Sequence, residues 1–367
     1  MKTVVLSLYE SYPPRFGAGT VTYNLFKHLK GKKDLIQIGP KNLMENHEGG
    51  KIISIGLKSS SRIEKFLKIF KVLRNMKKKV EEINPNVVIF EGASWSLYFL
   101  FLFKILKKRK IIYHDHNFEY ELRKQKENFL VRKITFFSEK YLLKNPYRSF
   151  MVSERDAEIA SKTYDIPKPK ILKNGVDFEK FNKIKNRDIK KIKKKYSLGK
   201  KNILFLGMPS YQPNKEAIEI LIKKIMPYVI RKHPSAKLII TGGKIDKKEK
   251  FIKNLGNIPF EDLPTLISSC SVGVAPIISG SGTRLKILEY MASGIPVVST
   301  SKGCEGIEIK NRKNIVVEND FNKFAKSVSD LLSDREFSDK IGKQGKKLVS
   351  SEYSYRKIIQ NFQEEIN

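Results

Sequence analysis

Cysteine, histidine and long apolar runs are scarce in this sequence. The two cysteines, Cys270 and Cys304, show neither a metal-binding spacing nor a disulfide framework, and they are expected to be small buried residues in a reducing compartment. The five histidines are scattered, with no His-Glu-x-x-His pattern and no acidic ladder. No apolar run approaches the roughly 18 residues of a membrane-spanning helix. The sequence therefore predicts no metal, no cofactor and no spanning segment.

Acidic residues are also few. The chain has 72 lysines and arginines against 38 aspartates and glutamates, a net charge of +34. Such a field favours anionic partners: nucleic acid, a phospholipid surface or phosphorylated substrates. A lysine-rich proteome can produce part of this charge without any function. A basic nucleic-acid-binding protein is one alternative, but aromatic residues do not interleave with the lysine runs as base stacking requires.

The length of 367 residues, 40% of them hydrophobic, suits two globular domains better than one. The lysine-rich stretch 183–201 is expected to be a linker or an exposed helix. This predicts a first domain over 1–182, a second over 202–350 and a final helix over 351–367 that crosses back to the first domain. The N-terminal apolar run stops at Glu10, which favours a first strand over a signal peptide and implies a cytoplasmic protein.

The stretch from Val272 to Thr300 carries the strongest functional signal. It reads VGVAPIISGSGTRLKILEYMASGIPVVST, which predicts a strand, a glycine-bearing loop, a helix from Arg284 to Ser293, a turn and a second strand. That order is half of a parallel α/β unit. It puts a loop of small residues at the N-terminus of a helix.

Such a loop can bind phosphate, because the first N–H groups of a helix have no partner within it and carry the positive end of its dipole. Gly280, Ser281 and Gly282 let the backbone approach a ligand closely. Arg284 and Lys286 add full positive charges one turn into the helix. A diphosphate site is therefore predicted. An ordinary surface loop is the alternative, because Gly-x-Gly alone is a weak pattern.

Glu289 follows in the same helix, where a carboxylate can accept hydrogen bonds from the vicinal hydroxyls of a ribose. The string GTRLKILEYMASGIPVVST resembles the donor-nucleotide signature of retaining nucleotide-sugar glycosyltransferases of family 4 (group 1). The resemblance implies the GT-B fold, an α/β architecture of two Rossmann-like domains with parallel sheets facing across a cleft. It also implies that the amides of Gly282 and Thr283 hold the diphosphate and that Glu289 holds the ribose. The family's first carboxylate is replaced here by Ser281, which puts the identity of the sugar in doubt.

The second domain departs from this family at one more place. Family members often carry an arginine after the glycine that ends the first strand of this domain, and a lysine on the next helix. Here Met208 follows Gly207, and Lys215 stands in the place of the lysine. Arg284 and Lys286 are expected to supply the missing phosphate charge.

The strand KIIYHDHN of the first domain ends in polar residues, at the sheet edge where open α/β proteins gather their chemistry. A lone histidine there is often structural. The segment HDHNFEYELRKQ, however, resembles the family's His-Asn-x-Glu-Tyr segment, with His116 in the place of its active-site histidine. The implied role is a hydrogen bond to the donor sugar near the bond that breaks. His116 and Glu289 are thus the two catalytic candidates.

The loop ESYPPRFGAGT follows the first strand and precedes a helix expected from Val21 to Leu29. It lacks the third glycine of a dinucleotide fingerprint, which argues against a dehydrogenase. The resemblance implies that Gly17 and Gly19 belong to a loop that binds phosphate and acceptor. A tight turn from strand to helix is the alternative.

Two apolar segments leave their role open. The pattern from Arg62 to Ile83 predicts a helix with an apolar stripe and a cationic face, typical either of a membrane-surface helix or of a core-facing helix in a lysine-rich protein. The run from Trp95 to Leu106 is apolar but short, which suits a buried helix, with an interfacial segment as the alternative.

The sequence supports one main hypothesis. It is a metal-independent transferase that moves a hexosyl unit from a UDP- or GDP-sugar to a hydroxyl of a glycan or lipid-linked acceptor, with retention. The basic charge suggests a peripheral position at the anionic inner face of the membrane. A nucleotide-sugar epimerase and an inverting transferase of the same fold are the nearest alternatives.

Overall fold

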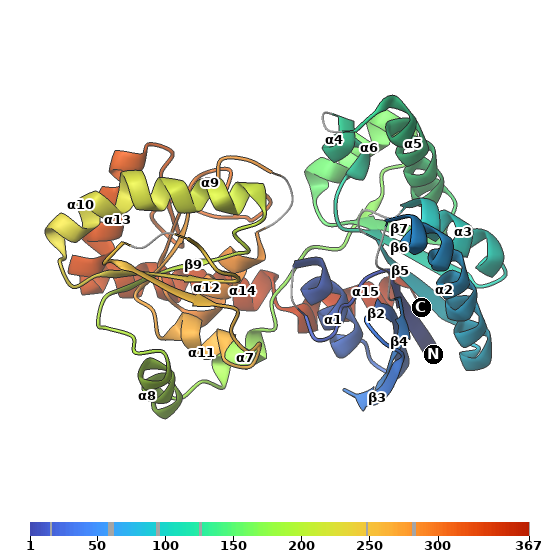
Figure 1. Cartoon of the computed structure of the whole chain (residues 1–367), viewed down its shortest axis with the longest axis horizontal. Helices are drawn as coiled ribbons and strands as arrows, with labels where there is room; N and C mark the ends of the chain where they lie inside the picture. Colours follow the sequence, from blue (N-terminus) through green and yellow to red (C-terminus); the bar gives the residue numbers. More distant parts are fainter. Residues whose placement is uncertain are drawn as a thin grey trace. The chain divides into compact units, whose positions relative to one another are not determined.

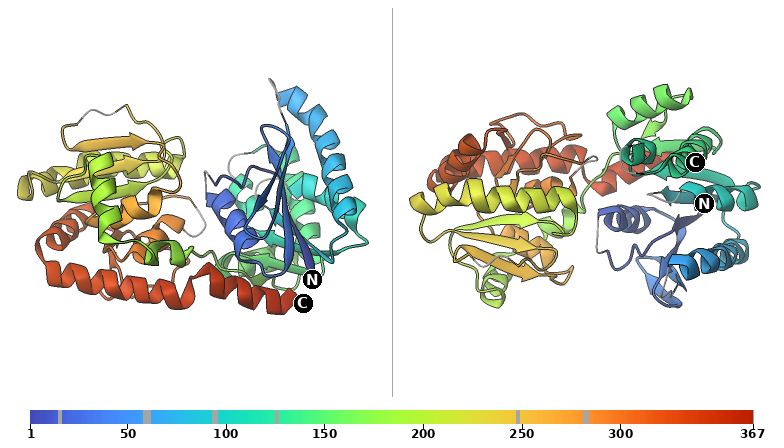
Figure 2. Two further views of the ribbon diagram at one scale, coloured as in Figure 1. Left: turned by 90° about the horizontal axis from the view of Figure 1, so that it is seen from below. Right: turned by 45° about the horizontal axis from the view of Figure 1, so that its top comes forward.

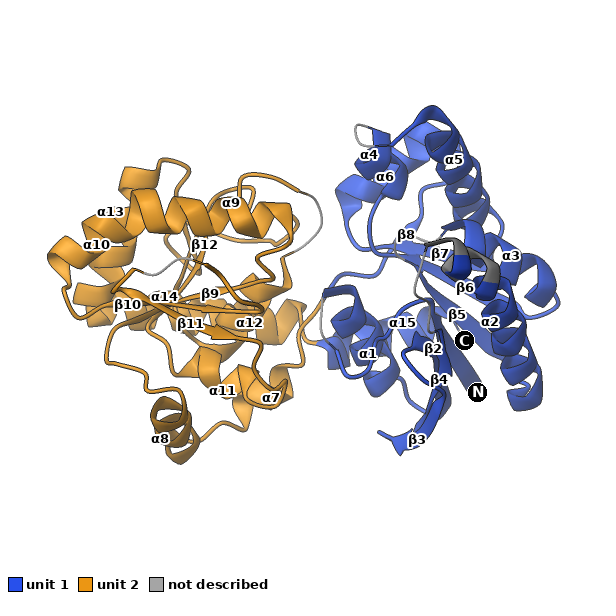
Figure 3. Ribbon diagram, in the orientation of Figure 1, with its two compact units in different colours: residues 1–174, 355–367 blue, residues 175–354 orange. Residues whose placement is uncertain are grey.

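A computed structural model of the chain describes residues 1–14, 17–57, 62–92, 96–124, 127–246, 249–280 and 284–366, without the side chains of 62, 63 and 65–67. The chain forms two compact units (Figure 3). Unit 1 comprises 1–174 and 355–367, and unit 2 comprises 175–354. Each unit is built around its own sheet (Figure 1).

Unit 1 contains an eight-stranded sheet of order β3-β4-β2-β1-β5-β6-β7-β8. Every pairing is parallel except that of β3 with β4. The strands are β1 (Lys2–Ser7), β2 (Lys32–Gly39), β3 (Leu43–His47), β4 (Gly50–Gly56), β5 (Val87–Gly92), β6 (Lys110–Asp115), β7 (Arg148–Met151) and β8 (Lys170–Ile171). The central strands β1, β5 and β6 are almost wholly buried, as expected of a parallel sheet covered on both faces.

Helices cover both faces of this sheet, and in Figure 2 its strands run between α1 (dark blue) and α2 (light blue). One face packs on α1 (Gly17–His28) and α15 (Tyr355–Ile366). The other face packs on α2 (Arg62–Ile83), α3 (Ser96–Leu106), α5 (Phe129–Lys144) and α6 (Glu154–Tyr164). Alternate residues of β1 serve the two cores: Val4 and Leu6 face one, and Val5 faces the other.

The two apolar segments whose role the sequence leaves open, in α2 and α3, contribute to the core of unit 1. On α2 the stripe that includes Ile69, Leu73 and Met76 is buried in unit 1. The alternative of a core-facing helix therefore holds for these residues, and a membrane-surface role for their apolar stripe is wrong. On α3, Phe99 and Leu102 are fully buried. Trp95, at the start of that run, lies outside the described residues.

Unit 2 contains a six-stranded sheet of order β11-β10-β9-β12-β13-β14, with every pairing parallel. The strands are β9 (Asn202–Leu206), β10 (Lys237–Thr241), β11 (Ile252–Gly256), β12 (Val272–Ala275), β13 (Val297–Ser299) and β14 (Val316–Val317). The predicted order of strand, loop, helix and strand is confirmed by β12, α12 (Leu285–Ser293) and β13. Gly294 ends α12 with a φ of 80°, a left-handed conformation that suits glycine.

The other helices of unit 2 contribute side chains to one continuous core with its sheet, except α8, which packs on α11. They are α7 (Phe178–Asn182), α8 (Asn186–Lys195), α9 (Gln212–Ile220), the π-helical turn η1 (Leu221–Ile225), α10 (Met226–Lys232), α11 (Leu263–Ser268), α13 (Phe321–Ser333) and α14 (Arg335–Glu352). Figure 1 shows α9 and α10 along one face of the sheet. The stretch 183–201, expected as a linker or an exposed helix, belongs to unit 2 and contains α8.

Two further details differ from the expected elements. Helix α1 begins at Gly17 and not near Val21, so Gly17 and Gly19 lie in its first turn. The final helix contains Tyr355–Ile366 and packs in unit 1, while 351 and 352 still belong to α14. Within the described part of the chain, no helix combines the length and the apolar character that crossing a bilayer requires.

Candidate functional site

In unit 1 the ionisable side chains of the candidate site lie at the carboxyl ends of β5 and β6. These parallel strands pair with Glu91 opposite His114 and Gly92 opposite Asp115. The N–H of His116 donates to the carbonyl of Gly92 at 3.0 Å, which extends the same alignment beyond β6. Because side chains alternate along a strand, His114 and His116 lie on the same side as Glu91.

Glu91 is a fully buried carboxylate held by two imidazoles. Its Oε1 lies 2.9 Å from Nδ1 of His114, and its Oε2 lies 2.7 Å from Nε2 of His116. Burial raises the pKa of Glu91, but the charges and hydrogen bonds of the two histidines outweigh it and bring this pKa to about 2. Glu91 is therefore ionised near neutral pH.

This charge state fixes the hydrogen on His116. A carboxylate can only accept hydrogen bonds, so the Nε2 of His116 must donate. Burial lowers the pKa of His116, against the opposing effect of Glu91, which favours the neutral ring. A neutral ring with a hydrogen on Nε2 has a bare Nδ1. That atom is able to accept a hydrogen bond from a hydroxyl group.

Tyr9 and Thr22 complete this cluster. Thr22 Oγ1 donates to Oε2 of Glu91 at 3.2 Å, so it must accept from the hydroxyl of Tyr9, which lies 2.9 Å away. The Tyr9 oxygen is also 3.4 Å from Nδ1 of His116. The hydrogen-bonded row of Tyr9, Thr22 and Glu91, in which Glu91 is the final acceptor, thus runs beside His116 and connects the end of β1 with α1 and β5.

Among the residues that the structure describes, Glu91, His114 and His116 form a group that could hold a metal ion, since their ligand atoms lie within 4.8 Å of one another. Both carboxylate oxygens, however, already accept from an imidazole at hydrogen-bond distance. A metal ion there would have to displace both of these protons. Hydrogen bonding is the simpler account of this grouping.

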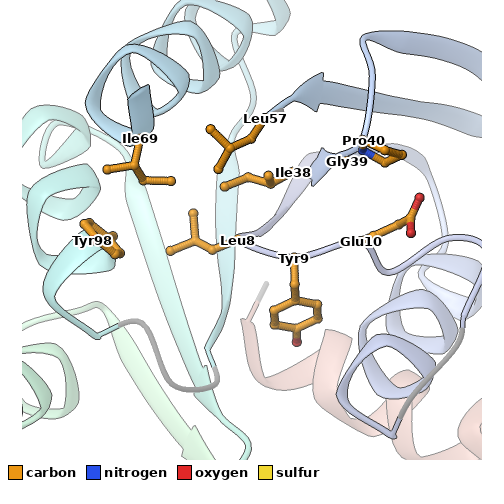
Figure 4. Close-up of a pocket in the computed structure, with 9 residues that line it drawn as sticks. All are labelled: Leu8, Tyr9, Glu10, Ile38, Gly39, Pro40, Leu57, Ile69 and Tyr98. Carbon is orange, nitrogen blue, oxygen red and sulfur yellow. The ribbon is translucent and has the colours of Figure 1, made fainter. Parts of the chain in front are cut away.

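A pocket of about 260 Å³ opens in unit 1 next to Tyr9 (Figure 4). Its side chains come from the ends of β1, β2 and β4 and from α2 and α3. They are Leu8, Tyr9, Glu10, Ile38, Gly39, Pro40, Leu57, Ile69 and Tyr98. Figure 4 shows the aliphatic side chains converging, with Glu10 to one side. The pocket is therefore mainly apolar and has one acid at its border.

In unit 2 the candidate site is built on α12. Lys286 and Glu289 are one turn apart on this helix, and both are partly buried. Lys286 Nζ donates to Oδ1 of Asn214 at 2.9 Å and lies 4.1 Å above the centre of the Phe205 ring. Asn214 belongs to the first turn of α9, which begins just after β9. Lys286 therefore reaches from α12 to the end of the first strand of this unit.

Burial changes the charge of both α12 groups. It lowers the pKa of Lys286 to about 7, helped by Arg284 and opposed by Glu289. It raises the pKa of Glu289 to about 7, against the charges of Lys286 and Lys180. Perturbed groups of this kind are frequent in functional sites. A bound anion would stabilise the charged form of Lys286.

Arg284 immediately precedes α12 and is held by the loop before it. Its Nη2 donates to the carbonyl oxygen of Ser279 at 3.0 Å. Ser279 Oγ in turn donates to Glu216 of α9 at 2.6 Å. The guanidinium is thus tied to α9 through one serine, which limits its movement.

The other predicted site residues fall in three groups. Ser281, Gly282 and Thr283 lie outside the described residues. Lys215 is exposed, one position beyond Asn214 on α9. Gly17 is exposed and Gly19 is buried in the first turn of α1.

Two models of known protein families match this chain. A model described as Glycosyltransferase Family 4 matches residues 17–180, and one described as Glycosyl transferases group 1 matches 200–334. The chain belongs to the family 4, group 1 glycosyltransferases. The resemblance found on the strand-end histidine and on the 272–300 stretch is therefore confirmed.

Curated relatives of this glycosyltransferase family member are distant. The putative glycosyltransferase YtcC of Bacillus subtilis is 28% identical over 258 residues, 62% of each chain. An uncharacterized 44.6 kDa protein in the cps region of Klebsiella pneumoniae is 25% identical over 268 residues, 68% of this chain and 65% of that protein. The chitobiosyldiphosphodolichol beta-mannosyltransferase of Candida albicans is 25% identical over 65% of this chain and 57% of its own. The chain thus spans less than two thirds of the length of each of these relatives.

Solved structures confirm the GT-B fold. Sucrose-phosphate synthase from Thermosynechococcus elongatus has a TM-score of 0.77 at 14% identity, over 100% of this chain and 98% of that one. Anabaena Alr3699/HepE in complex with UDP-glucose has a TM-score of 0.76 at 13% identity, over 100% and 99%. WaaG, a glycosyltransferase involved in lipopolysaccharide biosynthesis, has a TM-score of 0.70 at 13% identity, over 99% of both chains.

The sequence did not reveal Glu91, Tyr9 or Asn214 as members of these clusters. Glu91 ends an apolar strand, and its one signal was a charged residue after four apolar ones in NVVIFE. Tyr9 and Asn214 had no signal, because their roles depend on contacts with residues that are distant in the sequence.

Proposed function

We propose that this glycosyltransferase transfers a hexosyl unit from a UDP- or GDP-sugar to a hydroxyl acceptor, with retention at the anomeric carbon. The observation that carries the proposal is the arrangement on α12. Two cationic side chains, Arg284 and Lys286, are fixed by contacts to Ser279 and Asn214, and Glu289 follows one turn later. This is the chemistry that a nucleoside diphosphate requires: cations for the diphosphate and a carboxylate for the ribose.

The role of each group follows from the bond that breaks. Negative charge grows on the leaving diphosphate as the sugar departs, so cations fixed in advance stabilise the transition state more than the ground state. In this proposal Arg284 and Lys286 carry that charge, helped by the amides of Gly282 and Thr283, with Lys215 as a further contact. No metal ion is needed for this step.

Unit 1 is proposed to act on the sugar and the acceptor. The bare Nδ1 of His116 would accept a hydrogen bond from a sugar hydroxyl. The first turn of α1, with Gly17 and Gly19, offers N–H groups to a phosphate of the donor or acceptor. The apolar pocket beside Tyr9 suits the apolar part of an acceptor. A lipid-linked or cell-surface glycan precursor at the membrane meets that description, and chitobiosyldiphosphodolichol stands in the name of the Candida relative.

One observation favours an inverting transferase as the second candidate. The 2.7 Å contact of Glu91 with Nε2 of His116 is the arrangement of a general base oriented by a carboxylate. A base of this kind would take the proton of the acceptor hydroxyl in a direct displacement. The anomeric configuration of the product, read by nuclear magnetic resonance, separates the two: retention supports our proposal, and inversion supports the second candidate.

Calorimetric titration of the whole chain with UDP and with GDP tests the donor site. One of the two is expected to bind, and Glu289→Ala should weaken this binding by about 1 to 3 kcal/mol, the usual cost of leaving a polar group unpaired. Glu336→Ala, at an exposed glutamate of α14, is the matched control and should change nothing. If neither UDP, GDP nor any other nucleoside diphosphate binds, the proposal is wrong.

A further inference from the structure

Helix α5 has an apolar face that the fold of unit 1 leaves in solvent. Phe129 is 71% exposed, Leu130 65% and Phe137 57%, and Ile134 and Tyr141 are also exposed. Elsewhere in unit 1 and unit 2 the described exposed apolar side chains of this size occur singly or in pairs along the chain. A concentration on one helix is the kind of apolar patch that marks an interaction surface.

The exposed side chains form one continuous stripe. Leu130, Ile134, Phe137 and Tyr141 follow one another at steps of four, three and four residues, which places them on one side of an α-helix. The opposite side of α5 holds its buried residues, among them Glu139 and Leu142. The helix is thus apolar on its core side and again on its solvent side, whereas a surface helix is normally polar there.

Cations run along one edge of this stripe. Lys133, Lys140 and Lys144 are spaced by seven and four residues, so they form a second row beside the apolar one. The one acidic residue of α5, Glu139, is buried and accepts hydrogen bonds from the N–H groups of Glu119 and Tyr120. The exposed side of α5 therefore carries positive charge only.

The neighbouring helix extends the cationic area. Helix α3 packs beside α5, as Figure 3 shows, and the ring of Phe103 contacts that of Tyr141 at 5.6 Å. The end of α3 and the residues after it add the exposed Lys104, Lys107 and Lys108. We refer to Leu130, Ile134, Phe137 and Tyr141 together with Lys133, Lys140 and Lys144 as the α5 face.

We propose that the α5 face docks on an anionic phospholipid surface. An apolar stripe beside a row of lysines fits this partner. The apolar side chains insert at the boundary of head groups and acyl chains, and the lysines contact the phosphates. Either signal alone gives weak binding, and the two together give stable association. The net charge of +34 adds long-range attraction to the same surface.

This docking site is separate from α2, whose apolar residues are in the core. It is also distinct from the groups proposed for the transfer, so it goes beyond that function. It rests on the proposed function in one respect only: an acceptor carried by a lipid would be found at the surface that the α5 face binds.

The test is flotation of the whole chain with vesicles, either of phosphatidylcholine alone or of an equimolar mixture with phosphatidylglycerol. The wild type should float with the mixed vesicles at physiological salt and remain behind with phosphatidylcholine. Leu130→Ser combined with Phe137→Ser should abolish flotation, and both side chains are exposed, so folding should not suffer. Lys133→Glu, Lys140→Glu and Lys144→Glu together should weaken partitioning about a hundredfold or more, since each lysine near an anionic surface contributes roughly a factor of five.

Matched controls separate the α5 face from general effects. Lys340→Glu, Lys343→Glu and Lys347→Glu make the same charge change on exposed positions of α14 and should leave flotation nearly unchanged. Met44→Ser removes an exposed apolar side chain of β3 and should also be neutral. Calorimetric binding of UDP or GDP should be equal in all variants. If the wild type binds neither UDP nor GDP, that result counts against the proposed function and not against the docking site.

Two results would overturn the inference. One is flotation of the α5 variants at the level of the wild type. The other is a wild type that does not float with either vesicle but sediments as a dimer, and a Leu130→Ser, Phe137→Ser variant that sediments as a monomer. In that case the α5 face is an interface between two copies of this chain.

Discussion

Nε2 of His116 donates to the carboxylate of Glu91 across 2.7 Å, in a part of unit 1 where both side chains are buried. The contact joins the end of β6 to the end of β5. It determines which nitrogen of His116 carries the hydrogen, and so which nitrogen can accept a hydrogen bond, from a substrate in our proposal.

Replacement of Glu91 by glutamine should disturb this assignment. The amide oxygen can accept from one imidazole, but the amide nitrogen only donates, so the other imidazole must present a bare nitrogen. Turnover of the donor that calorimetry identifies should fall roughly tenfold to a hundredfold, as is usual for partners that orient a functional histidine. Nucleotide affinity should stay unchanged. Nitrogen chemical shifts of the histidine rings report the tautomers directly.

Thr22→Val is a milder change to the same hydrogen-bond cluster, and its turnover can be compared with that of Glu91→Gln. It removes one donor to Glu91 at 3.2 Å and keeps both imidazole contacts, so its effect on turnover should be smaller. Wild-type turnover and unchanged ring shifts in Glu91→Gln would show that Glu91 does not set the tautomer of His116.

Nucleotide affinity should decrease as the pH rises above 7. The pKa of Lys286 in the free protein is lowered to about 7 by burial, so at higher pH its side chain is neutral and must take up a proton to meet a diphosphate. The affinity then falls by up to roughly tenfold per pH unit. Ionisation of Glu289, whose pKa is also about 7, acts in the opposite direction. Titration between pH 7 and 9 in a Glu289→Gln background isolates the lysine.

Lys286→Arg serves as the control for this pH dependence. An arginine stays charged throughout the range, so in the same Glu289→Gln background the nucleotide affinity of this variant should not change with pH. An equally steep decrease in the arginine variant would assign the pH dependence to another group.

Gly207→Ala should weaken nucleotide binding at the proposed donor site by displacing Asn214. Gly207 has a φ of 153°, and a Cβ there would approach the side chain of Asn214 to 2.6 Å. Asn214 is the residue that holds Lys286. We expect a weaker nucleotide affinity and a loss of about 1 to 3 kcal/mol in the free energy of unfolding. Gly199→Ala, where the nearest atom is 3.9 Å away, should behave as wild type.

Tyr164→Phe tests a purely structural contact of unit 1. The hydroxyl of Tyr164 donates to Glu139 at 2.6 Å, and Glu139 also accepts from the first N–H groups of α4. Loss of this buried hydrogen bond should lower the free energy of unfolding by about 1 to 2 kcal/mol in urea titrations. Tyr147→Phe, at a half-exposed ring, should change it little. Equal stability of the two variants would contradict this account of Glu139.

The sequence predicted the regular elements where their signals are local. The apolar periodicity of Arg62–Ile83 predicted α2. The order of strand, loop and helix at 272–300 predicted the GT-B fold through its family signature. These features depend on residues that are near one another in the chain, so no tertiary information was needed.

Only the tertiary structure shows which helix faces and strand ends pack against one another. The sequence could not say whether the stripe of α2 faces a core or a membrane, because both require the same apolar spacing. Leu73 and Met76 are buried, which places that stripe in the core, whereas Leu130 and Phe137 of α5 are exposed. Glu91 joined His116 because parallel strands place their ends side by side, and Asn214 reached Lys286 because α9 and α12 begin near each other. Contacts between distant residues arise from packing, and a single sequence does not record them.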